Sequence, residues 1–131
     1  MANKPSGGDL RSIVVEGDSK KLVGWAETIG KGLASGGLTT SQIRNVFGII
    51  RQIEMQGYGD LTQQRKLLLL KPKLAYARGR ESNWEKRQVL QDLEDVLSPA
   101  IDLVENEQHF RNFFDFFEAI LAYHRAAGGK E

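Results

Sequence analysis

Histidines are the residues best suited to catalysis or metal binding in this chain, which contains two of them. His109 and His124 fall in one predicted helix, and 15 positions at 1.5 Å per residue separate them by roughly 22 Å. Neither follows a glutamate by three positions, as the ligands of a di-iron bundle do. There is no cysteine, which excludes disulfides, thiolate metal sites and cysteine nucleophiles. We therefore expect no catalytic residue, no metal site and no cofactor.

Motifs of the common enzyme classes are also missing from the sequence. Gly30-Lys31-Gly32 with Gly36 resembles a dinucleotide-binding loop, but its spacing is wrong and no strand precedes it. A phosphohydrolase built on a helical bundle would need clustered histidine and aspartate ligands. The sequence predicts a protein that is not an enzyme.

Basic residues are concentrated in the centre of the chain. Residues 39–87 contain ten lysines and arginines against four acidic residues, a difference of +6. Residues 88–131 contain three against nine, a difference of −6. A chain divided in this way can present a positive surface to an anion such as RNA. The alternative is a set of solvated helix surfaces that differ in sign by chance.

Several of the central cations recur at helical spacing. Arg44 and Arg51 are two turns apart, with Gly48 between them to let a phosphate backbone approach. Lys73 and Arg80 bracket Tyr76 on one side of a helix, a pattern that can offer charge to phosphates and a ring to a base. For Tyr76 alone we favour a core residue with a hydrated hydroxyl. The candidate RNA-binding residues are Arg44, Arg51, Lys71, Lys73, Arg78 and Arg80.

Helical periodicity predicts the elements that position these residues. A helix is expected over 19–35, from the spacing of Leu22, Ala26, Ile29 and Leu33. Capping boxes predict three further helix starts, in the pairs Thr39/Gln42, Asp60/Gln63 and Ser82/Glu85. A last helix is expected from Asn106 to the glycines at 128–129.

Prolines and glycines predict interruptions within this pattern. Pro72 and Pro99 each predict a kink or a break, and Gly79 is a candidate C-cap. No stretch alternates with period two. The fold class is therefore all-α, a single-domain bundle of about five helices.

The N-terminal part, residues 1–18, shows no helical period and is expected to be a flexible segment before a bundle domain over 19–128. Ile13 to Val15 could add an edge strand or dock as a short apolar segment. Residues 1–10 are polar, so no signal peptide is expected. No apolar run approaches the roughly 20 residues of a membrane helix.

Three segments together resemble the small helical subunit of the type III-A CRISPR interference complex, the Csm small subunit family. They are Leu38-Thr39-Thr40-Ser41-Gln42-Ile43-Arg44, Leu70-Lys71-Pro72-Lys73-Leu74-Ala75-Tyr76-Ala77-Arg78-Gly79-Arg80, and Phe116-Phe117-Glu118-Ala119-Ile120-Leu121-Ala122-Tyr123-His124. The resemblance spans roughly residues 38–125.

The resemblance implies a helical bundle that stacks in several copies along the guide–target duplex. Its partners would be target and guide RNA, other copies of itself, the repeated backbone subunit and the polymerase-like large subunit, without a membrane. It implies phosphate contacts at Arg44, Lys71, Lys73 and Arg80, whereas Arg78 departs from the family pattern. Arg51 rests on helical spacing alone.

Both lines of reasoning predict a non-catalytic protein that contacts RNA backbone without sequence specificity. The absence of cysteine fits a reducing cytoplasm, and the resemblance implies a prokaryotic one. We further expect copies to dock head to tail, with the acidic surface of the last two predicted helices, including Asp92, Glu94 and Asp95, against the basic surface of a neighbouring copy. The alternative is a protein-only helical adaptor that uses its acidic C-terminal half.

Overall fold

A computed structural model describes residues 3–129 of the chain as a bundle of six α-helices, without a strand in that range. The all-α prediction is confirmed, and the helix number is one more than the expected value of about five. The helices are α1 (Gly7–Val14), α2 (Ser19–Ser35), α3 (Thr40–Gln56), α4 (Leu61–Arg80), α5 (Trp84–Asp102) and α6 (Glu107–Ala126).

Local capping interactions explain where the central helices begin. At α3 the Thr39 hydroxyl accepts from the Gln42 amide at 3.2 Å, and Gln42 Oε1 accepts from the Thr39 amide at 3.0 Å. This reciprocal capping box confirms the prediction from the sequence. Asp60 caps α4 alone, by accepting from the Thr62 amide at 2.7 Å.

Two predicted helix boundaries are wrong by one or two residues. The N-cap of α5 is Asn83, which accepts from the Lys86 amide at 3.0 Å, and not Ser82. Asparagine and serine are equally good caps, so the sequence alone did not separate them. α4 continues past Gly79 and is followed by Glu81 as C-cap.

Neither proline breaks its helix. α4 continues through Pro72 and α5 through Pro99. Leu70 and Leu74, on either side of Pro72, are both buried, and their packing offsets the lost backbone hydrogen bond.

The N-terminal segment forms a helix, so the expectation that it lacks helical structure is wrong. Ser6 and Asp9 make a reciprocal capping box at its start, and Leu10, Ile13 and Val14 are buried. α1 packs against α2, α5 and α6. Its three apolar residues supply too short a pattern to predict a helix by periodicity, and of the two alternatives only the docked apolar segment is correct.

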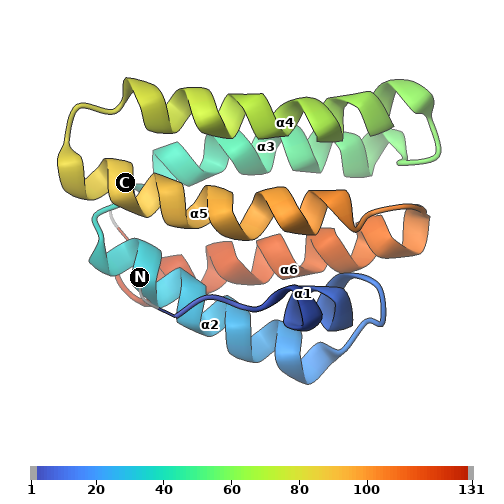
Figure 1. The fold of residues 1–131 in the computed structure, drawn as a ribbon, viewed down its shortest axis with the longest axis horizontal. Coiled ribbons are helices and arrows are strands. Elements are labelled where there is room, and N and C mark those ends of the chain that lie inside the picture. Colours follow the sequence, from blue (N-terminus) through green and yellow to red (C-terminus); the bar gives the residue numbers. More distant parts are fainter. Residues whose placement is uncertain (1–2, 130–131) are drawn as a thin grey trace.

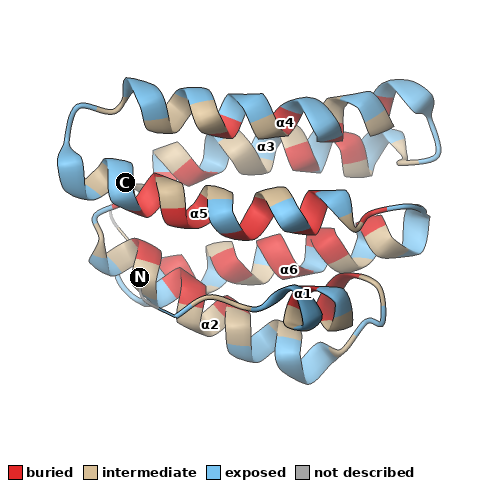
Figure 2. Cartoon of the chain, in the orientation of Figure 1, coloured by how far each residue is buried: buried red, intermediate tan, exposed pale blue. Residues whose placement is uncertain are grey.

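The helices stack in three tiers, with α3 and α4 at the top of Figure 1, α5 and α6 in the middle, and α1 and α2 below. Buried residues face the interior of this stack, whereas the outer side of α4 is largely exposed (Figure 2). The centre is filled by α6, whose Phe113, Phe116 and Phe117 are fully buried. α6 thereby provides the platform on which α2 and α3 pack.

Gly30 allows α2 and α6 to approach closely. A Cβ atom at this position would lie 2.7 Å from the Tyr123 Cβ and 2.8 Å from the Ile120 carbonyl oxygen. Glycine weakens a helix interior by up to ~1 kcal/mol. The close packing of α2 on α6 explains why a glycine is found at position 30.

Candidate nucleic-acid interface

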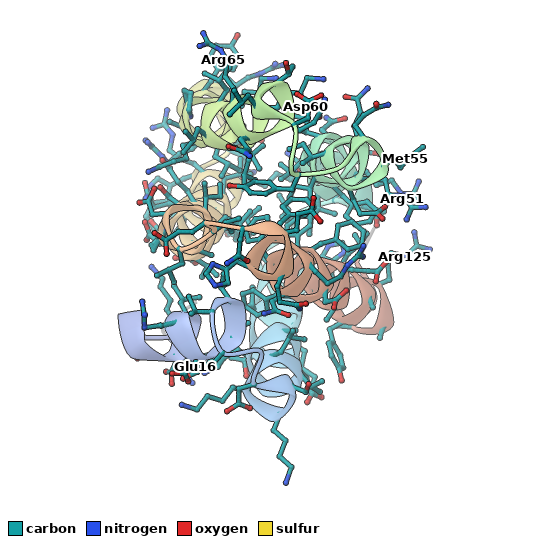
Figure 3. The ribbon with its side chains drawn as sticks, turned by 90° about the vertical axis from the view of Figure 1, so that its right-hand side faces the viewer. Glu16, Arg51, Met55, Asp60, Arg65 and Arg125 are labelled. Carbon is teal, nitrogen blue, oxygen red and sulfur yellow. The ribbon has the colours of Figure 1, made fainter. Side chains whose placement is uncertain are left out.

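The strongest concentration of positive charge lies on α4. Its 20 residues include six lysines and arginines and no acidic residue. Leu67, Leu70 and Leu74 are buried against the bundle and fix the orientation of the helix. Five of the six cations consequently lie on two edges, one facing α5 and one facing α3, while Arg65 projects outward from the helix (Figure 3).

The edge facing α5 carries two of the predicted RNA-binding residues in ion pairs. Lys71 Nζ lies 2.7 Å from Asp102 Oδ1, and Arg78 Nε lies 2.6 Å from Glu94 Oε1. The hydrogen bond to Glu94, followed by the charge of that carboxylate, raises the pKa of Arg78. Both cations therefore connect α4 to α5 in this structure.

The edge facing α3 carries Lys66, Lys73 and Arg80 at intervals of seven residues. Positions seven apart drift by only about 20° around a helix, and two turns separate them by roughly 10 Å. Within residues 3–129, Lys66 and Lys73 have no ion pair or hydrogen bond, and Arg80 contacts only the Tyr76 ring. This edge therefore presents a row of cations to solvent.

Lys73 and Arg80 line a groove of about 460 Å³ between α3 and α4. Its floor is apolar, and α3 contributes Gln42 and Asn45 to its wall. Glu81 is the one acidic residue of the lining, and it accepts a hydrogen bond from Gln42 Nε2 at 3.2 Å. The groove thus combines two free cations with neutral hydrogen-bonding groups.

Arg44 and Arg51 lie on the outer side of α3, apart from the groove. Figure 3 shows Arg51 and Met55 projecting together from α3, while Arg65 projects from the top of α4. Arg44 has no ion-pair partner among residues 3–129, and Arg51 lies 3.7 Å from Glu54. A Cβ at Gly48 would have no neighbour within 4 Å, so the backbone between the two arginines is open to a ligand.

Tyr76 is exposed, with 68% of its surface accessible, so its interpretation as a core residue is wrong. The Arg80 guanidinium lies over its ring, 5.8 Å from the centroid. Tyr58 shows the opposite arrangement. It stacks on Phe110 and donates to the Val104 carbonyl oxygen at 3.3 Å. Helical spacing could not indicate the burial of Tyr58, because that residue lies in the loop between α3 and α4.

Acidic residues of α5 are occupied within the molecule. Lys4 Nζ lies 3.2 Å from Asp92 Oδ1 and 2.7 Å from Asp95 Oδ2, and Asp92 is buried. Glu94 is paired with Arg78. The three acidic residues expected to dock a second copy are therefore engaged internally.

Both histidines have structural roles. His124 is fully buried and donates from Nε2 to the Leu38 carbonyl oxygen at 2.6 Å. His109 Nδ1 accepts from the Glu105 amide at 3.2 Å beside the N-cap Asn106. Among residues 3–129 no group of three histidine or acidic side chains is placed to hold a metal ion, and no helix in that range is long and apolar enough to cross a membrane.

The sequence reasoning did not select Lys66 as a site residue, although its position seven residues before Lys73 was a usable signal. Conversely, it grouped Lys71 and Arg78 with the exposed cations. Their partners lie 31 and 16 residues away in sequence, so helical spacing gave no sign of the pairs.

The fold and this surface define a class of small helical bundle with one strongly cationic helix. Comparison with protein families identifies the family: the model of Csm2 Type III-A matches residues 16–130. The chain belongs to this family, the small subunit of type III-A CRISPR effector complexes. No curated protein and no solved structure shows a match. α1 precedes the matched region, although its apolar side is part of the core.

Proposed function

We propose that this chain is a non-catalytic subunit that contacts RNA backbone without sequence specificity through the α3–α4 surface. The observation that carries the proposal is the row of Lys66, Lys73 and Arg80, which faces solvent beside a groove and has no carboxylate partner within residues 3–129. Unpaired cations neutralise phosphates and release counterions, which favours binding to any sequence.

Membership of the Csm2 family supports the assignment of RNA as the anion. In an RNA-guided complex, base pairing supplies sequence specificity, so a protein beside the duplex needs only to recognise backbone and shape. We propose that several copies stack along the guide–target duplex, where weak contacts repeated in each copy give a high combined affinity. In this assignment Lys73, Arg80 and Arg44 contact phosphates, with Arg51 in a weaker role, and Lys71 and Arg78 hold α4 against α5.

The competing function is a protein-only adaptor that uses the acidic C-terminal half. Lys4, Lys71 and Arg78 form ion pairs with four carboxylates of α5, with Lys4 shared by Asp92 and Asp95, Lys71 facing Asp102 and Arg78 facing Glu94. This pairing reduces the acidic surface available to a protein partner. Asp115 and Glu118 of α6 are exposed and unpaired within residues 3–129, so they would still be available for docking between copies.

Fluorescence anisotropy with labelled RNA tests the proposal. Replacing Lys66, Lys73 and Arg80 with alanine should weaken binding to any RNA sequence at low salt. A matched control replaces Arg11, Lys20 and Lys86 with alanine, which removes the same charge from α1, α2 and α5 at cations that likewise have no ion pair within residues 3–129. Equal loss in both triple variants would mean that net charge, and not this surface, determines binding.

A further inference from the structure

One line of α4 is both apolar and exposed, beside the row of cations. Leu68 and Tyr76 have 57% and 68% of their surface accessible, and Leu69 has 44%. Leu69, Pro72 and Tyr76 are spaced by three and four residues, so they share one side of the helix. An exposed apolar surface bordered by polar groups is typical of a binding site.

Tyr76 occupies a particular place on this side. Lys73 precedes it by three residues and Arg80 follows it by four, so both cations lie next to the ring on the helix surface. The guanidinium of Arg80 covers the ring at 5.8 Å from the centroid. The tyrosine hydroxyl has no hydrogen-bond partner in the part of the chain that the structure describes. Nothing in the described fold therefore requires an aromatic residue at this position.

We propose that Tyr76 is a stacking platform for an unpaired base of single-stranded RNA, with Lys73 and Arg80 contacting the phosphates on either side of that nucleotide. Every base has a π-face, so stacking on tyrosine adds affinity without sequence specificity. Leu69 and Pro72 extend the apolar support beside the ring. A base that is paired and stacked within a duplex cannot reach the ring, so Tyr76 takes an unpaired base, whereas Lys73 and Arg80 can contact backbone phosphates whether or not the neighbouring bases are paired.

The cations favour RNA over a second copy of the chain on this side of α4. A symmetric α4–α4 contact on this side would bring Arg65, Lys66, Lys73 and Arg80 of one copy close to the same four cations of the other, with no acidic residue on either helix. That arrangement is repulsive, whereas the polyanionic backbone of RNA matches the cations on both sides of the ring.

This inference rests on the proposed function, and its test separates the two. The probes are labelled oligoadenylate of roughly ten nucleotides, within the range that a small domain covers, and an abasic ribose–phosphate oligomer of the same length. The two carry the same charge and differ only in their bases. Anisotropy titrations at one low salt concentration should show oligoadenylate binding roughly fivefold or more tightly, as expected for one stacked base.

The variants assign the preference to Tyr76. Tyr76→Ala should bind both oligomers with the affinity that the wild-type protein has for the abasic oligomer. Tyr76→Phe should retain the preference for oligoadenylate because the ring remains. Leu61→Ala removes another exposed apolar side chain from α4 and should also retain it. Equal binding of both oligomers by the wild-type protein would overturn the stacking platform and leave the backbone contacts in place.

A preference that persists in Tyr76→Ala would also overturn it, because the base would then stack elsewhere, for example on the exposed Trp84. Absence of binding to either oligomer would overturn the proposed function together with this inference. Thermal unfolding of Tyr76→Ala should match that of the wild-type protein, since the side chain is mostly exposed.

Discussion

The two edges of α4 carry the same residue types within one helix, yet the tertiary structure assigns them different roles. On one edge, Lys71 and Arg78 meet carboxylates of α5 at 2.7 and 2.6 Å. On the other edge, Lys66, Lys73 and Arg80 have no ion pair among the residues that the structure describes. Lys73 and Arg80 line the groove between α3 and α4, and the one carboxylate of that groove, Glu81, accepts a hydrogen bond from Gln42. α5 is rich in acidic residues and α3 has one, Glu54, which faces Arg111 of α6 at 3.5 Å.

The difference shows that the role of a surface cation depends on the helix packed beside it. A lysine beside a helix with facing carboxylates forms an ion pair and is partly neutralised. A lysine beside a helix without a facing carboxylate remains available to an anionic ligand. Variants of α4 test this difference between its edges, and the largest effect comes from a change that affects both edges at once.

The largest effect is expected from the buried side of α4, which positions both edges. Leu74 is 3% exposed, so Leu74→Ala should lower the free energy of unfolding by about 2–5 kcal/mol through the loss of apolar contacts and the cavity left behind. Urea denaturation followed by circular dichroism measures this change. Leu68→Ala, on the exposed side of the same helix, is the control and should have little effect.

A direct comparison of the edges uses two double variants that remove the same charge. Lys73→Ala with Arg80→Ala should weaken RNA binding several-fold, because these cations are free to contact phosphates. Lys71→Ala with Arg78→Ala should weaken it much less, because Asp102 and Glu94 already neutralise them. Anisotropy titrations of both proteins against one RNA measure the difference, and the reverse order of affinities would contradict the division of α4 into two edges.

The salt dependence of RNA binding should also differ between variants of the two edges of α4. On a single strand, the slope of log affinity against log salt concentration is about −0.7 per phosphate neutralised. Removing Lys73 and Arg80 should therefore make the slope less negative by about 1.4. Titrations over a series of salt concentrations measure it, and the α5-edge double variant should retain the wild-type slope.

The smallest effect is expected in the pH dependence of stability that comes from the ion pair between Lys4 and Asp95 of α5. Burial raises the pKa of Asp95, but hydrogen bonds from Lys4 and Gln91 outweigh it, so the net pKa is lowered from 3.8. A lowered pKa in the folded state gives stability that is present above the unfolded pKa and is lost as pH falls through the folded value.

Asp95→Asn should therefore be less stable than the wild-type protein at neutral pH, and the difference should shrink below about pH 3.9. Chemical denaturation of both proteins over pH 2–7 would show it; a difference independent of pH would mean that the carboxylate charge contributes nothing. The hydrogen bond to Asp95 also raises the pKa of Lys4. At alkaline pH, the contribution of this ion pair to stability is therefore lost only as pH rises through the raised pKa of Lys4.

The sequence by itself determined the features that depend on neighbours within one or two helical turns. The Thr39/Gln42 capping box, the Asp60 and Asn106 caps, and the buried positions Ile43, Ile50 and Ile53 of α3 all follow from such local spacing. The helical class and the concentration of cations between residues 39 and 87 could also be predicted, because they need no knowledge of which helices pack together.

Tertiary structure alone decided which of these cations are free and which aromatic residues are exposed. Lys71 and Asp102 are 31 residues apart, and only the packing of α4 on α5 brings them together. Tyr58 is covered by α6 and stacks on its Phe110, while Tyr76 lies on the exposed side of α4. α1 becomes a helix because α2, α5 and α6 provide a surface for Leu10, Ile13 and Val14. Eight residues are too few to form a stable helix without such a surface.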